Sequence, residues 1–116
     1  MLRKLIRMIG LDFTAKTELL RLLAAAESKL RALGDKPVWS SYESGPAMAD
    51  FVAHARVQIE NDAITQAEKS ELWGIFAPTC DWDDAVGDVQ LGNDIFSILD
   101  VMYRGDIHFP NAESGP

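Results

Sequence analysis

The chain has 116 residues, of which 47% are hydrophobic, and its formal net charge is −7. This length suits a single domain with a core large enough to fold without cross-links, and the single cysteine excludes an internal disulfide. Because no apolar run approaches the roughly 20 residues of a membrane span, we expect one cytoplasmic domain over residues 1–116.

The charge is unevenly divided along the chain. Residues 1–36 hold eight basic and four acidic side chains, a net charge of +4, whereas residues 37–116 hold three basic and fourteen acidic ones, a net charge of −11. Nucleic-acid binding needs a basic surface, so we expect no nucleic-acid partner. Two interpretations stay open: steering toward a basic protein partner, or solubility combined with internal pairing to the basic first third.

The N-terminal residues 1–11 predict a short amphipathic helix. Apolar residues recur at helical spacing, with the basic residues off that line and Gly10 expected to end the helix: Leu2, Leu5, Ile6 and Ile9. Such a helix packs on its own domain or on a second copy, and its four apolar anchors are too few for stable membrane insertion. It is therefore the candidate interface for a homodimer.

Three further helices are predicted up to residue 78. Residues 14–33 carry a regular apolar stripe and Gly34 should end that helix. Ser44-Gly45-Pro46 should start the next helix, which ends near residue 61. Thr65 and Glu68 have the spacing of a capping box, so we expect them to start a third helix.

A last helix is predicted from Ile95 to Arg104, beginning at Asn93 or Asp94. It is apolar on nearly all sides, so we expect it to be the most buried element. Residues 111–116 read as a flexible tail. The predicted fold is all-α, an irregular four- to five-helix bundle with one structured acidic loop.

That loop, residues 77–88, has no helical period and contains four aspartates, a tryptophan and Cys80. An EF-hand starting at Asp81 would need suitable residues at its fifth, sixth and twelfth positions, which are Ala85, Val86 and Gly92, so the EF-hand prediction fails. A non-standard cation site remains open, against the alternative that the aspartates cap turns.

No constellation for catalysis stands out. Cys80 could meet His54 or His108 in space, but the nearby carboxylates disfavour a thiolate and no basic residue lies close in sequence. Neither a phosphate-binding loop nor a dinucleotide-binding loop is present. We therefore expect no enzyme, no catalytic residues, no metal site and no cofactor.

Recognition of a protein is the remaining interpretation of the acidic loop. Trp82 would anchor a partner while the carboxylates around it pair with Arg or Lys of that partner. The alternative is that Trp82 turns inward between the third and last helices. The predicted partner-binding residues are Asp81, Trp82, Asp83, Asp84 and Asp88, joined by Glu68 and Glu71 if the preceding helix faces the same way.

The run Ile75-Phe76-Ala77-Pro78-Thr79, with Asp81-Trp82-Asp83-Asp84, Gly87-Asp88 and Leu91-Gly92-Asn93, resembles small bacterial helical proteins of the toxin-immunity type. The resemblance covers residues 65–105. It implies a protein that binds and neutralises a toxin domain with a basic surface, and it supplies no catalytic residues. The alternative function is a structural or regulatory homodimer without catalytic activity.

Overall fold

The computed structural model describes residues 2–36, 42–77 and 81–103, and for residues 2–13 and 84 it describes the backbone alone. These residues form α1 (Leu2–Arg31), α2 (Gly45–Glu60), α3 (Gln66–Phe76), α4 (Asp81–Ala85) and α5 (Val89–Tyr103). No strand occurs among them, so the predicted all-α fold of four to five helices is confirmed.

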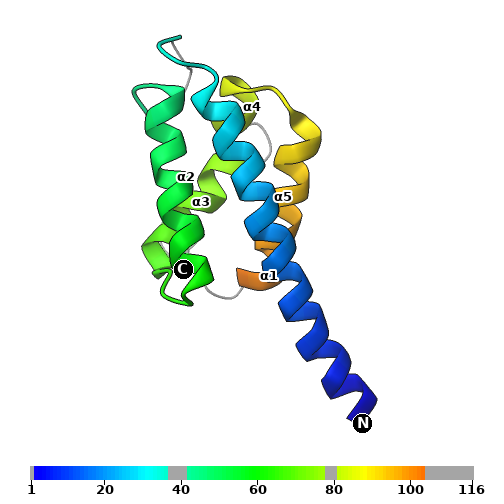
Figure 1. Ribbon diagram of the computed structural model, residues 1–116. Helices are drawn as coiled ribbons and strands as arrows, with labels where there is room; N and C mark the ends of the chain where they lie inside the picture. The colour runs from blue at the N-terminus through cyan, green and yellow to red at the C-terminus, as the bar shows by residue number, and fades with distance from the viewer. Residues whose placement is uncertain (1, 37–41, 78–80, 104–116) are drawn as a thin grey trace, which may run out of the picture.

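Four helices form a bundle whose neighbours run in opposite directions (Figure 1). Helix α1 lies beside α2 and α5, and α3 lies beside the same two helices on the opposite side. The short helix α4 sits between α3 and α5 at the upper end of the bundle. The short connection 61–65 between α2 and α3 favours their antiparallel arrangement.

The core consists of one apolar stripe from each long helix together with one side chain from α4. The stripes expected for the helices at 14–33 and 46–61 are buried largely as predicted. The buried hydrophobic side chains are Leu19, Leu22, Leu23, Ala26, Leu30, Met48, Ala49, Val52, Ala55, Ile59, Leu72, Ile75, Phe76, Trp82, Ile95 and Leu99.

The predicted starts of α2 and α3 are confirmed. The Ser44 hydroxyl accepts a hydrogen bond from the Ala47 N–H at 3.2 Å, with Pro46 in the first turn. At α3 the capping box is complete, because Thr65 Oγ1 accepts from the Glu68 N–H at 3.1 Å and Glu68 Oε1 accepts from the Thr65 N–H at 2.8 Å. Each cap satisfies backbone donors that have no partner inside the helix.

Two separate helices were expected before residue 34, and this prediction was wrong. Helix α1 is continuous from Leu2 to Arg31, and Gly10 lies within it. A glycine inside a helix costs about 1 kcal/mol relative to alanine, which favourable neighbours on both sides can offset. Gly34 follows the end of α1 with a φ of +57°, the left-handed conformation expected of a glycine beyond a helix end.

The expected bounds and burial of the last helix were also wrong. Helix α5 begins at Val89, well before Asn93, and Val101 on its outer face is 75% exposed. Its neighbours in the bundle are α1 and α3, so one side alone is covered and Ile95 and Leu99 fill that side. Cys80, His108 and the tail at 111–116 lie outside the described residues.

Candidate binding surface

The acidic segment is helical in its middle, contrary to the expected non-helical loop. Helix α4 spans Asp81–Ala85, and the Trp82 carbonyl accepts hydrogen bonds from the Val86 N–H at 2.9 Å and the Gly87 N–H at 3.3 Å. Aspartate favours the first turn of a helix because its carboxylate faces the positive end of the helix dipole. Helix α4 has five residues, so this preference of aspartate for a first turn leaves no apolar period over several turns in the sequence.

Trp82 points inward and is fully buried. Its ring lies 5.3 Å from the Phe76 ring, centroid to centroid, and its Nε1–H donates to the Asp88 carbonyl at 2.7 Å. The inward alternative therefore holds for this residue. A partner cannot reach the indole in this structure, so the prediction of Trp82 as a surface anchor was wrong.

The buried indole lies directly against the backbone of α5 at Gly92. A Cβ atom built on Gly92 would stand 2.4 Å from Trp82 Cδ1, which is closer than real Cβ contacts come. Sequence reasoning missed this role of Gly92. The available signal was a glycine inside a helix, which often marks close packing.

Asp88 is a structural residue at the start of α5. Its Oδ1 accepts from the Leu91 N–H at 3.2 Å, as an N-cap does, and its Oδ2 lies 3.3 Å from Lys29 Nζ of α1. One carboxylate thus caps α5 and joins it to α1. Both of its oxygens already have partners within the chain.

Glu71 and Asp81 lie around the phenol of Tyr42. The Tyr42 hydroxyl donates a hydrogen bond to Glu71 Oε2, and its ring stands 6.3 Å from that of Phe51. Burial raises the pKa of Tyr42, and the hydrogen bond to Glu71 and the negative charges of Glu71 and Asp81 raise it further. The structure therefore brings these two predicted site residues together.

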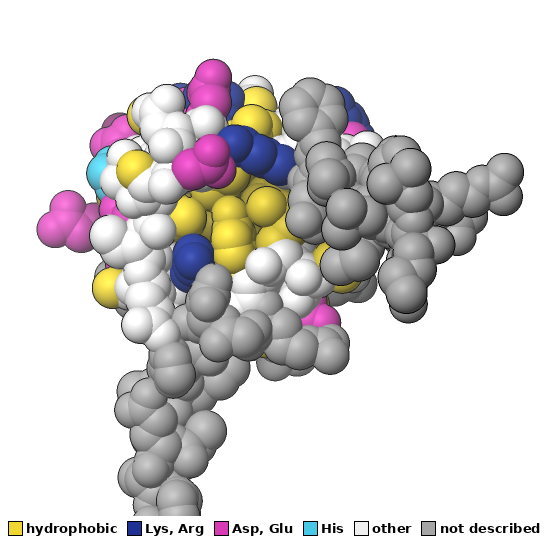
Figure 2. Space-filling view, turned by 90° about the horizontal axis from the view of Figure 1, so that it is seen from below, with side chains coloured by type: hydrophobic (Ala, Val, Ile, Leu, Met, Phe, Trp, Pro, Cys, Tyr) yellow, Lys and Arg dark blue, Asp and Glu magenta, His cyan; other side chains and the backbone are white. Residues whose placement is uncertain are grey.

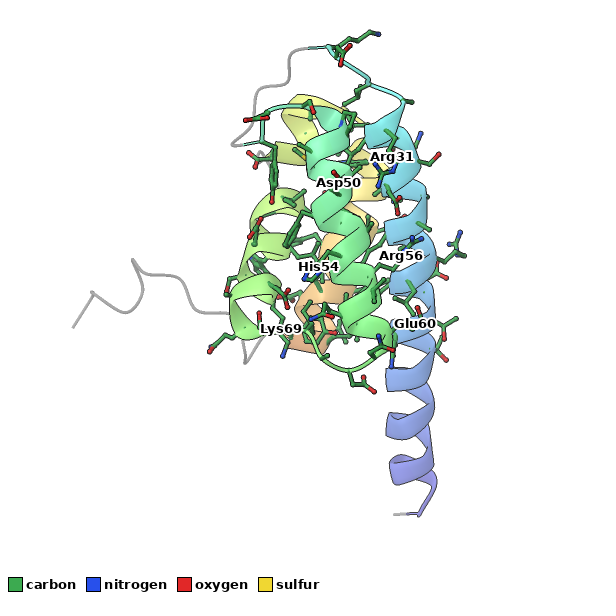
Figure 3. The ribbon with its side chains drawn as sticks, turned by 60° about the vertical axis from the view of Figure 1, so that its left-hand side comes forward. Arg31, Asp50, His54, Arg56, Glu60 and Lys69 are labelled. Carbon is green, nitrogen blue, oxygen red and sulfur yellow. The ribbon has the colours of Figure 1, made fainter. Side chains whose placement is uncertain are left out.

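Glu68 lies at the other end of α3, away from α4 (Figure 1). Besides forming the capping box, Glu68 contacts His54 of α2: Glu68 Oε2 lies against His54 Nε2, on the side of α2 that faces α3 (Figure 3). The hydrogen bond from the Thr65 N–H, followed by that from His54, lowers the pKa of Glu68 to about 2. Glu68 is therefore separate from the α4 group of the predicted site.

The acidic surface extends beyond the predicted loop. Between Asp81 and Tyr103, the span of α4 and α5, the sequence contains six aspartates and no lysine, arginine or histidine. Asp81 and Asp83 are partly exposed, and Asp94 is exposed on α5, where its Oδ1 accepts a hydrogen bond from Gln90 at 2.8 Å and its charge acts on Arg21 of α1. We call this span the acidic α4–α5 unit. Its signal in the sequence was the absence of basic residues over two consecutive helices.

A second charged cluster, which the sequence analysis did not find, joins α1 to α2 (Figure 3). Arg31 Nε lies 2.9 Å from Glu27 Oε2, and Arg31 Nη1 lies 3.0 Å from Asp50 Oδ1. Arg56 Nη2 approaches Glu27 Oε1 to 2.9 Å, an ionic contact without hydrogen-bond alignment. The spacing of Glu27 and Arg31 by four residues was its one visible signal.

Internal pairing uses several cations of the basic first third. The pairs are Lys16 with Asp62 at 3.0 Å, Lys29 with Asp88 at 3.3 Å and Arg31 with Asp50 at 3.0 Å. These contacts agree with the second interpretation of the charge asymmetry. They leave a large acidic excess in residues 37–116, since that part holds fourteen acidic against three basic side chains.

Within the described residues, no three side chains of His, Cys, Asp or Glu gather as a set that could hold a metal ion. None of the helices described is both long enough and apolar enough to cross a membrane.

Comparison with protein-family models, curated proteins and solved structures finds no match for this chain.

Proposed function

We propose that this protein is an immunity-type protein of the cytoplasm, which binds a bacterial toxin domain through the acidic α4–α5 unit and neutralises it without catalysis. The observation that carries the proposal is the run of six aspartates without a basic residue between Asp81 and Tyr103. The likeness of residues 65–105 to small immunity-type proteins directs the proposal to a toxin as the partner.

The electrostatic part of the proposal rests on unequal charge. Lys29 of α1 makes an ion pair with Asp88 of the acidic α4–α5 unit, whereas the unit itself contains six acidic and no basic side chains. A basic surface, such as one that binds a phosphate backbone, would be attracted to the negative net charge of this unit. Complementary fields of this kind raise association rates and fix the orientation of the partner.

The structure changes which residues we assign to the contact. Trp82 is buried and Asp88 caps α5, so both support the surface from within. Asp83 at the partly exposed side of α4 and the exposed Asp94 of α5 become the preferred contact residues. Their charges act together with those of Asp81, Asp84 and Glu71.

The experiment is co-expression with the products of the neighbouring genes, read out by co-purification and by rescue of growth from a toxic neighbour. If a neighbour is toxic and the chain neither binds it nor restores growth, the proposal is rejected. A toxic neighbour that the chain binds, with growth restored, supports the proposal. The complex then allows the surface to be tested by variants.

The test variant is Asp83→Asn with Asp94→Asn, and the matched control is Glu18→Gln with Glu60→Gln, which removes the same charge from α1 and α2. We expect the test variant to weaken binding on the order of tenfold at low salt and to reduce the salt dependence, because it removes charge at the contact. The control should stay close to wild type. Equal effects of both variants would show that overall charge, and not this surface, drives binding.

A further inference from the structure

The N-terminal turns of α1 extend past the rest of the molecule. Among the side chains of α1 that the structure describes, from Thr14 onward, the first buried one is Leu19, and Figure 1 shows the backbone of the helix continuing beyond the lower ends of α2, α3 and α5. Residues 2–13 span about 18 Å at 1.5 Å per residue. We call them the projecting segment. Most of the stability of a helix in a protein comes from tertiary packing of one face, so a surface that packs on the projecting segment would stabilise it.

The sequence pattern of the projecting segment differs from that of the core part of α1. At 100° per residue, Leu2, Leu5, Ile6 and Ile9 centre on a line about 100° around the helix from the line of the buried positions Leu19 to Leu30. The stripe of these four residues is therefore offset from the line that packs into the bundle, and Met8 is the residue of the segment that falls on that line. The direction of the stripe favours a contact outside its own core.

The end of the bundle from which α1 projects has an apolar surface. Figure 2 looks at this end and shows hydrophobic side chains gathered in the middle of it, with Lys or Arg side chains at their edge. Partly buried hydrophobic residues at the matching ends of the helices include Ile64, Met102 and Tyr103. Lys69 Nζ lies 4.8 Å from the centre of the Tyr103 ring. We call this the lower end of the bundle.

Charge separates the two surfaces. Residues 2–13 contain three basic and one acidic side chain, whereas residues 14–116 contain eight basic and seventeen acidic ones. The projecting segment is thus positive and the body is strongly negative. An anionic membrane would attract the segment but repel the body, whereas a second copy of the chain offers a body that attracts it.

We infer that two copies of the chain form a homodimer in which the projecting segment of each copy packs on the lower end of the other. A reciprocal contact of this kind is closed by a two-fold axis and stops at two subunits. The apolar stripe covers the hydrophobic surface of the partner, and the opposite net charges of the segment and the body favour the association. This interface uses the C-terminal end of α5, whereas Asp83 of the proposed toxin contact lies in α4 at the upper end of the bundle (Figure 1).

The test is light scattering on the full chain at micromolar concentration, where we expect twice the 12.8 kDa of a single chain. The test variant Leu5→Asp with Ile6→Asp places charge on the stripe and should give a monomer. The matched control Met8→Asp with Leu11→Asp adds the same charge off the stripe, on the side of the helix toward the line of buried positions, and should remain a dimer. Far-ultraviolet circular dichroism compares helix content among the three proteins.

A second pair of variants tests the docking surface. Tyr103→Ser at the lower end should weaken dimerisation on the order of tenfold, whereas Val101→Ser on the exposed outer face of α5 should leave it unchanged. The proposal is overturned if the wild type is monomeric or if Leu5→Asp with Ile6→Asp stays dimeric. It is also overturned if, in either comparison, the test variant and its control dimerise equally well. Sedimentation of a monomeric wild type with phosphatidylglycerol vesicles would assign the segment to a membrane instead.

Discussion

Two connections of the bundle end in a capped helix, but different forces hold them. Between α2 and α3, Thr65 and Glu68, three residues apart, form two hydrogen bonds with each other, and residues 61–63 are exposed. Between α3 and α5, Trp82 is buried in the core, contacts Gly92 and donates a hydrogen bond to the Asp88 carbonyl. The first connection is ordered by local bonds and the second by tertiary packing. The acidic surface therefore depends on the core beneath it.

The largest expected effect tests the tertiary connection at its centre. Trp82→Ala should lower the free energy of unfolding by about 3–5 kcal/mol, because it leaves a cavity where a fully buried indole lies. Urea unfolding followed by circular dichroism measures the loss. Trp82→Phe keeps a ring in the core but loses the Nε1–H hydrogen bond to Asp88, so it should cost less. A loss below about 1 kcal/mol for Trp82→Ala would contradict the packing role.

The next effect compares two helical glycines. Gly92→Ala should destabilise by about 1–3 kcal/mol, because its Cβ would stand 2.4 Å from Trp82 Cδ1. Gly74→Ala in α3 is the matched control, since its Cβ would meet nothing within 4 Å. There the gain in helix propensity should stabilise by about 0.5–1 kcal/mol. Opposite signs of the two changes in urea midpoint support the comparison, and the same sign for both contradicts it.

The two connections also differ in how far they could be predicted from sequence. The spacing of Thr65 and Glu68 predicted the start of α3, because both partners of a capping box lie within one turn. The start of α5 at Asp88 was missed, because several aspartates of this segment are able to cap, and Asp88 is held at the helix start by a tertiary contact, the hydrogen bond from Trp82 to its carbonyl. Helix periodicity predicted the core stripes of α1 and α2, where each stripe repeats over several turns.

The candidate site shows the same limit. Acidic composition predicted a negative surface around α4, but whether a carboxylate faces a partner depends on contacts from elsewhere in the chain. Glu68 contacts His54, Glu71 accepts from Tyr42, and Asp88 pairs with Lys29. The sequence separation of these pairs is too large for spacing rules, so the pairings became visible with the fold alone.

A smaller effect compares the two caps directly. Asp88→Ala and Thr65→Ala each remove the side-chain acceptor at a helix start, which costs about 0.5–2 kcal/mol. We expect Asp88→Ala to cost more, since it also breaks the pair with Lys29 of α1. Thermal or urea unfolding of both variants measures the difference. Lys29→Met separates the contributions, because it removes the ion pair and leaves the cap; if it equals Asp88→Ala, the cap contributes nothing.

The smallest effect lies in the pH dependence of the local connection. The pKa of Glu68 is lowered from 4.5 to about 2 in the folded chain, first by the hydrogen bond from the Thr65 N–H. The folded state therefore favours the carboxylate, and the stability from this shift is fully present above about pH 4.5 and lost as the pH falls toward 2.

Glu68→Gln should reduce the slope of the free energy of unfolding against pH in that window, an effect of less than about 1 kcal/mol for a pair near the surface. Thr65→Ala keeps the backbone N–H that is the largest cause of the shift and removes the smaller contribution of the Thr65 side chain, so it should lower stability at every pH while preserving most of the slope. Urea midpoints between pH 2 and 6 distinguish the two variants, and an unchanged slope in Glu68→Gln would mean that other carboxylates control acid unfolding.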